Sequence, residues 1–290
     1  MANFCGKCIG IGLRRTKRDE LPSWQVRKTG RIFETGFMNA LMRFVGMGAV
    51  SVFALVILPG CRTEAAAGRI TGGKSVESTP VAIREHTEEA QARITPRQAL
   101  AELKAGNARF VAGKLRDRYL PEEVRATAPH QYPFAAIVSC IDSRVPVELV
   151  FDQGIGDVFS ARVAGNVLND DVVGSLEFAC KVSGAKLIVV LGHSNCGAIK
   201  GAIDDVQLGK LTGLLQKIKP AEDRVPQSIC PRTAKNKEFV QEVTEQNVRL
   251  VMEQIRERSP VLREMQDAGK IGVIGGMYDL RTGETQFMAE

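Results

Sequence analysis

The chain has 290 residues, of which 44% are hydrophobic and 25% charged, a composition that excludes a mainly disordered protein and can supply a full α/β core. The formal net charge of +6 is confined to the N-terminal part, because residues 1–61 hold 9 Lys/Arg against 3 Asp/Glu whereas residues 62–290 hold 30 of each. The neutral body and the aromatic content of 6% give no support for nucleic-acid binding through a basic or stacking surface.

An uncharged segment over residues 44–58 follows Arg43 and ends at the LPGC sequence that carries Cys61. A membrane-spanning helix needs about 20 apolar residues, so this shorter run fits the hydrophobic region of an export signal better. The LPGC ending resembles a lipobox, whose cysteine becomes the lipidated first residue, although Pro59 stands where a small residue is usual. We therefore expect an exported lipoprotein, periplasmic or membrane-anchored through Cys61. A short membrane anchor and a cytoplasmic protein are the alternatives.

The residues on either side of this signal have no periodic apolar pattern. Residues 1–37 form a long Arg-rich lead, and Met38 would begin a signal of ordinary length, which makes Met38 the candidate true start. Residues 62–94 are rich in Gly, Thr, Ser and Glu, and we expect a flexible tether in which His86 is solvated. The folded domain is expected over residues 95–290.

The elements predicted for the folded part alternate between helices and strands. Thr95 before Pro96 is typical of a helix start, and apolar residues recur at helical spacing as far as Gly113. The sequence predicts further helices over 146–152, 170–183 and 236–258, and strands over 134–139, 157–163, 186–192, 271–277 and 285–288. Near-continuous apolar strands separated by helices indicate an α/β fold with a mainly parallel central β-sheet flanked by helices.

Reactive side chains follow two of these strands. The first strand ends in Cys140, Asp142 and Arg144, spaced two apart, and we expect the three groups to lie close together if the chain stays extended. The third strand ends in His193 and Cys196. Ligands bind beyond the carboxyl ends of strands in open α/β sheets, so adjacent strands would bring both groups to one site.

Two thiolates and an imidazole make a zinc site with a fourth position left for water or another side chain. The alternative interpretation is a pair of buried cysteines that act as small hydrophobic residues and a histidine that is only hydrogen-bonded. The second group of polar residues, together with the carboxylate and arginine of the first, favours the metal site.

The CIDSR and HSNC sequences, which begin at Cys140 and His193, resemble the Cys-x-Asp-x-Arg and His-x-x-Cys signatures of the β-class carbonic anhydrases. The likeness extends to ELKAGNARFVAG around Asn107, to FDQGIGDVFSARVAGN over residues 151–166 and to GHSNCGAIKGA around the second motif. It covers roughly residues 95–290, so the resemblance implies a β-carbonic anhydrase-like fold for this part of the chain.

The resemblance also implies roles for individual residues. Zinc would be held by Cys140, His193 and Cys196, while Asp142 would either pair with Arg144 or move onto the metal. The implied reaction is the reversible hydration of CO₂ to bicarbonate and a proton by attack of zinc-bound hydroxide. Gln131, nine residues before Cys140, matches a family position that orients the substrate. Relatives form dimers or dimers of dimers, which implies a homodimer or larger assembly.

Two other functions remain open at the level of the sequence. Relatives with the same zinc ligands hydrolyse CO₂ analogues such as carbonyl sulfide or carbon disulfide. A zinc-holding protein without turnover is the second alternative, although the intact Asp142 and Arg144 argue against it.

Overall fold

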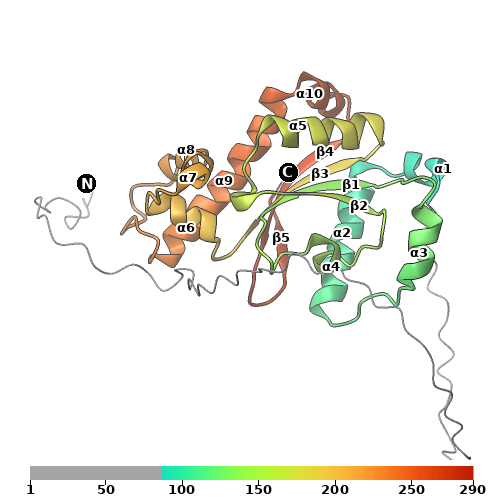
Figure 1. Cartoon of the computed structure of the whole chain (residues 1–290), viewed down its shortest axis with the longest axis horizontal. Helices are drawn as coiled ribbons and strands as arrows, with labels where there is room; N and C mark the ends of the chain where they lie inside the picture. Colours follow the sequence, from blue (N-terminus) through green and yellow to red (C-terminus); the bar gives the residue numbers. More distant parts are fainter. Residues whose placement is uncertain (1–85, 290) are drawn as a thin grey trace, which may run out of the picture. The chain divides into compact units, whose positions relative to one another are not determined.

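The computed structural model describes residues 86–289 (Figure 1). The predicted export signal, with Met38 and Cys61, lies outside the described residues, as does the tether over 62–85. The described elements are, in chain order, α1 (Glu88–Ala92), α2 (Pro96–Val111), α3 (Leu120–Thr127), β1 (Ala135–Ser139), α4 (Val147–Val150), β2 (Val158–Arg162), the 3₁₀ turn η1 (Ala164–Asn166), α5 (Asp170–Glu177), the π-helix η2 (Phe178–Val182), β3 (Leu187–His193), α6 (Gly197–Ile203), α7 (Gly209–Leu215), α8 (Lys219–Asp223), α9 (Lys237–Arg258), α10 (Pro260–Asp267), β4 (Gly272–Tyr278) and β5 (Thr285–Phe287).

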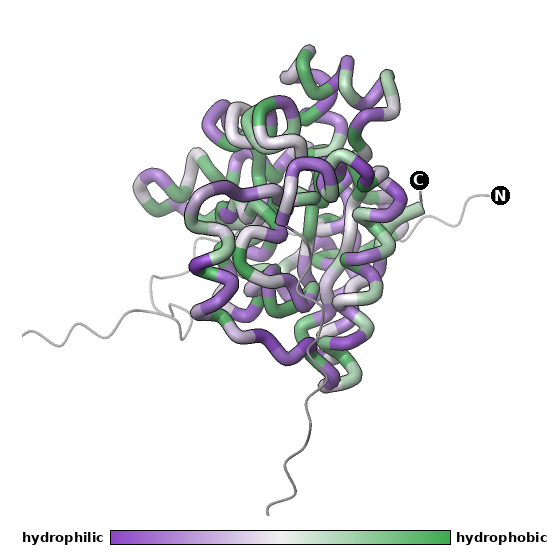
Figure 2. The backbone as a smooth tube through the Cα atoms, turned by 90° about the vertical axis from the view of Figure 1, so that its right-hand side faces the viewer, coloured by the Kyte–Doolittle hydropathy of each residue, from purple (hydrophilic) through white to green (hydrophobic). Residues whose placement is uncertain are grey.

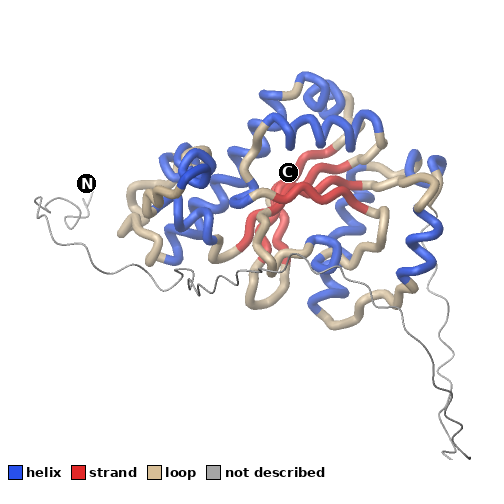
Figure 3. The backbone as a smooth tube through the Cα atoms, in the orientation of Figure 1, coloured by secondary structure: helices blue, strands red, loops and turns tan. Residues whose placement is uncertain are grey.

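The strands, red in Figure 3, lie together in one sheet. This sheet has five strands in the order β2-β1-β3-β4-β5. β1 pairs in parallel with both β2 and β3, and β3 pairs in parallel with β4. Only β5 is antiparallel within this sheet, through its pairing with β4. The predicted α/β fold with a mainly parallel sheet is therefore confirmed, and all five strands lie within a residue or two of their predicted positions.

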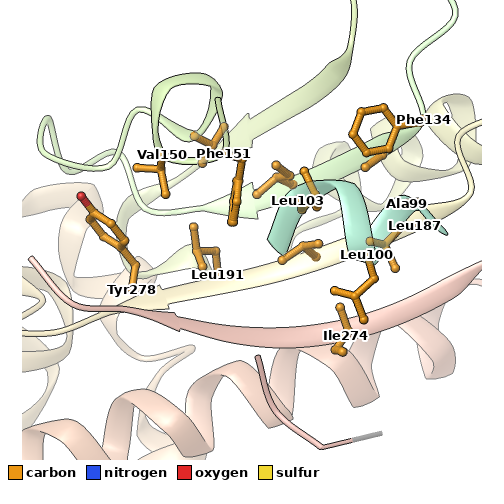
Figure 4. Packing of buried hydrophobic residues seen from close by; sticks show 14 of the residues in the cluster. Ala99, Leu100, Leu103, Phe134, Val150, Phe151, Leu187, Leu191, Ile274 and Tyr278 are labelled. Carbon is orange, nitrogen blue, oxygen red and sulfur yellow. The ribbon is translucent and has the colours of Figure 1, made fainter. Parts of the chain in front are cut away.

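Helices cover both faces of the sheet, as the apolar strands require. On one face α2 and α4 contribute to a buried cluster that contains Leu103, Phe134 and Phe151 (Figure 4). On the other face α5, α9 and α10 pack against alternate residues of β1 and β3. Hydrophilic and hydrophobic residues follow one another in short stretches along the helices (Figure 2), as expected of helices with one buried face.

Local signals account for the two main helices. α2 begins with a capping box, in which the Thr95 hydroxyl accepts from the Gln98 backbone N–H and the Gln98 side chain accepts from the Thr95 backbone N–H. α9 begins after Asn236, whose side chain accepts from the Glu238 N–H. Both helices were predicted, α2 from Thr95 before Pro96 and from its apolar spacing, and α9 from its amphipathic pattern.

The predicted tether reaches too far along the chain. Residues 88–92 form α1, capped by Thr87, and the Gln91 side chain donates to the carbonyls of Pro133 at 2.6 Å and Ser183 at 2.7 Å. The prediction of a solvated His86 is also wrong, because its side chain is 8% exposed and its Nε2 lies 3.7 Å from an Asp157 oxygen. Polar side chains anchor this segment, so apolar periodicity could not reveal it.

The predicted helix over 170–183 changes character partway along. α5 ends at Glu177 and the chain continues as η2. After η2 the Ala185 N–H donates to the Ala179 carbonyl, just before β3 begins. The helices α3, α6, α7, α8 and α10 were not predicted individually, since most of them are a turn or two long. Within residues 86–289, no helix is both long enough and apolar enough to cross a membrane.

Candidate metal and active site

Three potential metal ligands meet at the carboxyl ends of β1 and β3. Cys140 follows β1, His193 is the last residue of β3, and Cys196 caps α6. One ligand atom from each lies within 4.8 Å of the other two, and all three residues are buried. Since β1 and β3 are parallel neighbours, the sheet itself brings together residues that are 53 positions apart.

The His193 ring presents an unprotonated nitrogen to the two sulfurs. Its Nδ1 lies 3.0 Å from the Ser194 carbonyl oxygen, which can only accept, so Nδ1 carries the proton. The other nitrogen, Nε2, is buried and has no hydrogen-bond partner among the described residues. A buried lone pair without a donor is the state that a metal-binding imidazole needs.

Ser194 in turn is fixed to the neighbouring strand. Its N–H donates to the Tyr278 carbonyl at 2.9 Å, and its hydroxyl accepts from the Leu280 N–H at 3.0 Å. The orientation of His193 therefore depends on β4 and on the turn that follows it. Ser194 was not among the residues predicted from the sequence, because its only signal is its place directly after the histidine.

The two sulfurs share a hydrogen bond within an apolar cluster that includes Ile199 and Phe239. This bond from Cys196 lowers the pKa of the Cys140 thiol to about 4, and the Gly165 N–H, which also donates to the Cys140 sulfur, lowers it further. The same bond raises the pKa of Cys196, because its proton is held between the two sulfurs. Two sulfurs of which one ionises readily, and an imidazole lone pair, fit the donor set that Zn²⁺ prefers.

Asp142 and Arg144 form a bidentate ion pair beside these ligands. The Arg144 side chain donates from Nε to Oδ1 at 2.9 Å and from Nη2 to Oδ2 at 2.7 Å, and its backbone N–H donates to Oδ1 at 3.0 Å. Hydrogen bonding to Arg144 lowers the pKa of the Asp142 carboxyl to about 2. Its Oδ2 lies 3.9 Å from His193 Nε2, so the ionised carboxylate borders the ligand cluster without being one of its three members.

The backbone at this pair differs from the expected extended chain. The Val145 N–H donates to the Asp142 carbonyl at 3.0 Å, which closes a turn over residues 142–145. The Asp142 side chain helps to form this turn by accepting from the Arg144 N–H. The expectation of an extended chain was therefore wrong, although the two side chains do meet.

Arg162 at the end of β2 supports the same loop from the other side. Its Nε donates to the Cys140 carbonyl at 3.1 Å and its Nη2 to the Asp142 carbonyl at 2.6 Å. β1 and β2 pair so that Ser139 lies opposite Arg162, which places the guanidinium next to the residues that follow β1. This contact was not predicted from the sequence, because it depends on the register between β1 and β2.

The fold does not bring Gln131 to this site within one chain. Gln131 precedes β1 and is exposed, whereas Cys140 follows β1. A strand advances about 3.3 Å per residue, so a strand of this length separates its two ends by roughly 17 Å. A role for Gln131 at a metal centre therefore requires a second copy of the chain.

A cavity of about 710 Å³ opens beside the ligand cluster. It is lined by Arg144, Ser194, Asn195, Lys200 and Tyr278, among other residues. Arg144 thus lines one cavity together with residues that follow β3 and residues that end β4.

Comparisons with known proteins identify the kind of molecule that shares these features. The family model described as carbonic anhydrase matches residues 135–285. Carbonic anhydrase 2 of Mycobacterium tuberculosis is 36% identical over 189 residues, which cover 65% of this chain and 90% of that protein. The carbonic anhydrase of Mycolicibacterium smegmatis is 37% identical over 193 residues, which cover 66% of this chain and 92% of that protein.

A solved structure gives the corresponding match in three dimensions. The crystal structure of the β-carbonic anhydrase CafA of Aspergillus fumigatus matches with a TM-score of 0.53 and 29% identity. The match covers 67% of this chain and 91% of that chain.

Proposed function

Because the chain belongs to the β-class carbonic anhydrase family, we propose that it catalyses the reversible hydration of CO₂ to bicarbonate and a proton. We infer that a zinc ion is held by Cys140, His193 and Cys196. The observation that carries this proposal is the cluster of these three buried ligand atoms within 4.8 Å of one another, beside an ionised aspartate.

The proposed ligands suit a catalytic metal more than a structural one. Three protein ligands leave one position open, whereas structural zinc sites are closed by four. A bound zinc ion supplies a Lewis acid that lets a water molecule lose its proton near neutral pH. The remaining tasks fall to side chains of this chain: to hold that water, to keep a hydrogen-bond acceptor ionised, and to admit CO₂.

Asp142 performs the second of these tasks. Its carboxylate is ionised at neutral pH, as an unperturbed aspartate also is, and the hydrogen bond from Arg144 lowers its pKa further, to about 2, so it accepts a hydrogen bond and cannot donate one. Oδ2 accepts one bond from Arg144 and keeps lone-pair capacity toward the ligand cluster, from which it lies 3.9 Å at His193 Nε2. Arg144 holds the carboxylate in this orientation and away from direct coordination.

Gln131 takes a part in this proposal only across a subunit boundary. Exposed apolar side chains lie on the preceding segment, with Tyr119 64%, Leu120 51% and Val124 52% exposed, as expected of a surface that another chain covers. We propose a homodimer, or a dimer of dimers, in which Gln131 of one copy orients the substrate in the site of the other.

The sequence of residues 44–61 supports a further proposal about location. An uncharged run followed by LPGC is expected to direct export and lipid attachment at Cys61. Metabolic labelling with a lipid precursor tests this, because the Cys61→Ala variant should lose the label that the natural chain acquires.

CO₂ hydration measured with a pH indicator in stopped flow tests the main proposal. We expect activity in the zinc-loaded chain, loss after chelation and recovery after zinc is added back. Cys196→Ala should abolish zinc binding and activity. Cys180→Ala, which removes a buried cysteine outside the ligand cluster, should keep both.

A zinc-loaded chain without CO₂ hydration would contradict the proposal. The same preparation assayed on carbonyl sulfide and carbon disulfide then distinguishes a hydrolase of a CO₂ analogue from a protein that only holds zinc.

A further inference from the structure

Gly165 is held at both ends by contacts that lead from α9 to a proposed metal ligand. Its N–H donates to the Cys140 sulfur at 3.3 Å. Its carbonyl accepts from the Asn247 side-chain amide at 2.9 Å, a contact that spans 82 positions of the chain. Asn247 and the Cys140 sulfur are thus linked through a single residue of the turn η1.

The backbone conformation of Gly165 is one that other residues rarely adopt. Its φ of +66° lies in the left-handed region, and a Cβ there would come within 2.8 Å of Ile218 Cδ1 and 3.2 Å of Ala198 Cβ. Only glycine fits these limits, but glycine also has the most conformational freedom to lose. η1 is three residues long, so no helical ladder fixes its conformation.

Asn247 is placed to hold the backbone of Gly165 in one conformation. It lies on α9, a 22-residue helix that packs against β3 and β4 (Figure 1), and it is fully buried. Its Oδ1 atom is buried without a hydrogen-bond partner among the described residues, so the bond to Gly165 is the one that its side chain makes. A buried amide that satisfies only one of its two polar atoms costs stability, which points to a role in the site.

We propose that Asn247 is a positioning residue of the metal site. It holds Gly165 so that the Gly165 N–H stays directed at the Cys140 sulfur, and this hydrogen bond orients the sulfur and draws charge from it. The inference rests on the proposed zinc site and adds a residue from α9, an element that carries none of the ligands. Direct hydrogen-bond partners of metal ligands typically change metal affinity by about 10- to 100-fold when they are removed, and Asn247, which acts through Gly165, is expected near the lower end of this range.

Asn107 provides a matched control for the test. It is also a buried asparagine, and its amide donates to the Val150 carbonyl at 3.0 Å and the Gly283 carbonyl at 2.9 Å. Its Oδ1 accepts from the Thr285 N–H at 2.7 Å. Its contacts fasten α2 to the turn before β5 and to α4, and none of them reaches Cys140 or Gly165.

The experiment compares Asn247→Ala with Asn107→Ala in the full chain. Three quantities are measured for each variant. Zinc affinity is obtained by competition with a chromophoric chelator, the geometry of the site from the sulfur-to-metal absorption band after cobalt substitution, and stability from the midpoint of thermal unfolding. We expect Asn247→Ala to bind zinc about 10-fold or more weakly and to shift the cobalt band. Asn107→Ala should lose as much thermal stability and leave both metal readouts at wild-type values.

Each outcome decides between the roles. Asn247 would serve only the fold if Asn247→Ala kept the wild-type zinc affinity and cobalt band. The same conclusion would follow if Asn247→Ala and Asn107→Ala lost zinc affinity to the same extent. If Asn247→Ala does not fold, Asn247→Leu, which fills a similar volume without a hydrogen-bond donor, carries the same expectation. A wild-type chain that binds neither metal would overturn the proposed function together with this inference.

Discussion

Arg144 controls the direction and the charge of one carboxylate. It donates three hydrogen bonds to Asp142, two from its side chain and one from its backbone, and the side-chain bonds vanish in Arg144→Ala. Asp142 is then free to approach the metal position. We expect turnover to fall about 100-fold or more while zinc content stays unchanged, measured by stopped flow and by metal analysis of the same sample.

The control for this change removes an arginine from an ion pair elsewhere on the surface. Arg256 contacts Asp267 at 2.6 Å, and both side chains are largely exposed. Arg256→Ala should leave turnover at its original value. Normal turnover in Arg144→Ala would count against the role given to the Asp142 pair.

The buried thiol of Cys180 is expected to lower the stability of the folded chain as pH rises into the alkaline range. Burial raises the pKa of its thiol to about 12, whereas an unfolded cysteine loses its proton at about pH 8.5. Between these values the folded state binds one more proton than the unfolded state, so stability falls as pH rises, by about 1.4 kcal/mol per pH unit. Urea unfolding at pH 9 to 10.5 should show this decline reduced in Cys180→Ala.

Val173 gives the matching control. It packs in the same cluster as Cys180, and Val173→Ala removes buried apolar volume without removing a titrating group. Its stability should be lower at every pH, and the decline should keep its wild-type slope. An unchanged slope in Cys180→Ala would show that another group causes the decline.

At the scale of elements, strand ends were predictable and the turns between them were not. The strands of the sheet are runs of apolar residues, and their order along the chain placed Cys140 and His193 at one edge. The turn at Asp142 depends on a side-chain bond to its own backbone, which an alternating pattern does not reveal. Asp279 and Arg281 repeat the same spacing and form the same type of pair, so this contact is local and does not itself mark a site.

Contacts between elements were out of reach for the same reason. Arg162, Ser194 and Asn247 contact backbone groups of residues that are far away in the chain. Their positions become meaningful only when the strand register and the path of α9 are known. Residue type and local spacing hold no information on either.

The short helix α1 is expected to depend on one side chain. Gln91 is buried and donates to two backbone carbonyls, those of Pro133 and Ser183. Gln91→Ala leaves both without this donor, and we expect a loss of about 1–3 kcal/mol in the free energy of unfolding, measured with denaturant. Hydrogen exchange should also become faster over residues 88–92.

Glu89 on the exposed side of α1 is the control for this change. Glu89→Ala should alter stability by about 0.5 kcal/mol at most. Equal effects of the two substitutions would mean that α1 contributes through its helix and not through the buried contact of Gln91.

At the scale of the whole molecule, the distance between Gln131 and Cys140 leads to a test with mixed subunits. Arg144→Ala would damage the site of its own chain, whereas Gln131→Ala would damage the site of its partner. In a mixed dimer one site then carries both defects and the other carries neither. Random exchange of equal amounts should restore about a quarter of the wild-type CO₂ hydration, because half of the dimers are mixed.

The two parent variants, assayed separately at the same concentration, set the baseline for this measurement. Activity of the mixture that equals the mean of the parents would mean that Gln131 does not act across a boundary. Size-exclusion chromatography with light scattering shows whether dimers are present in each sample.

The separation of Cys140 from His193 and Cys196 by a whole strand crossover has a kinetic consequence. A chain in which β1 and β3 have not yet paired has no place where the three groups can bind one ion. An ion that binds so late stabilises the native state more than the folding transition state, so it should slow unfolding far more than it speeds folding. The zinc-loaded protein would then be stabilised mainly by slow unfolding of its native state.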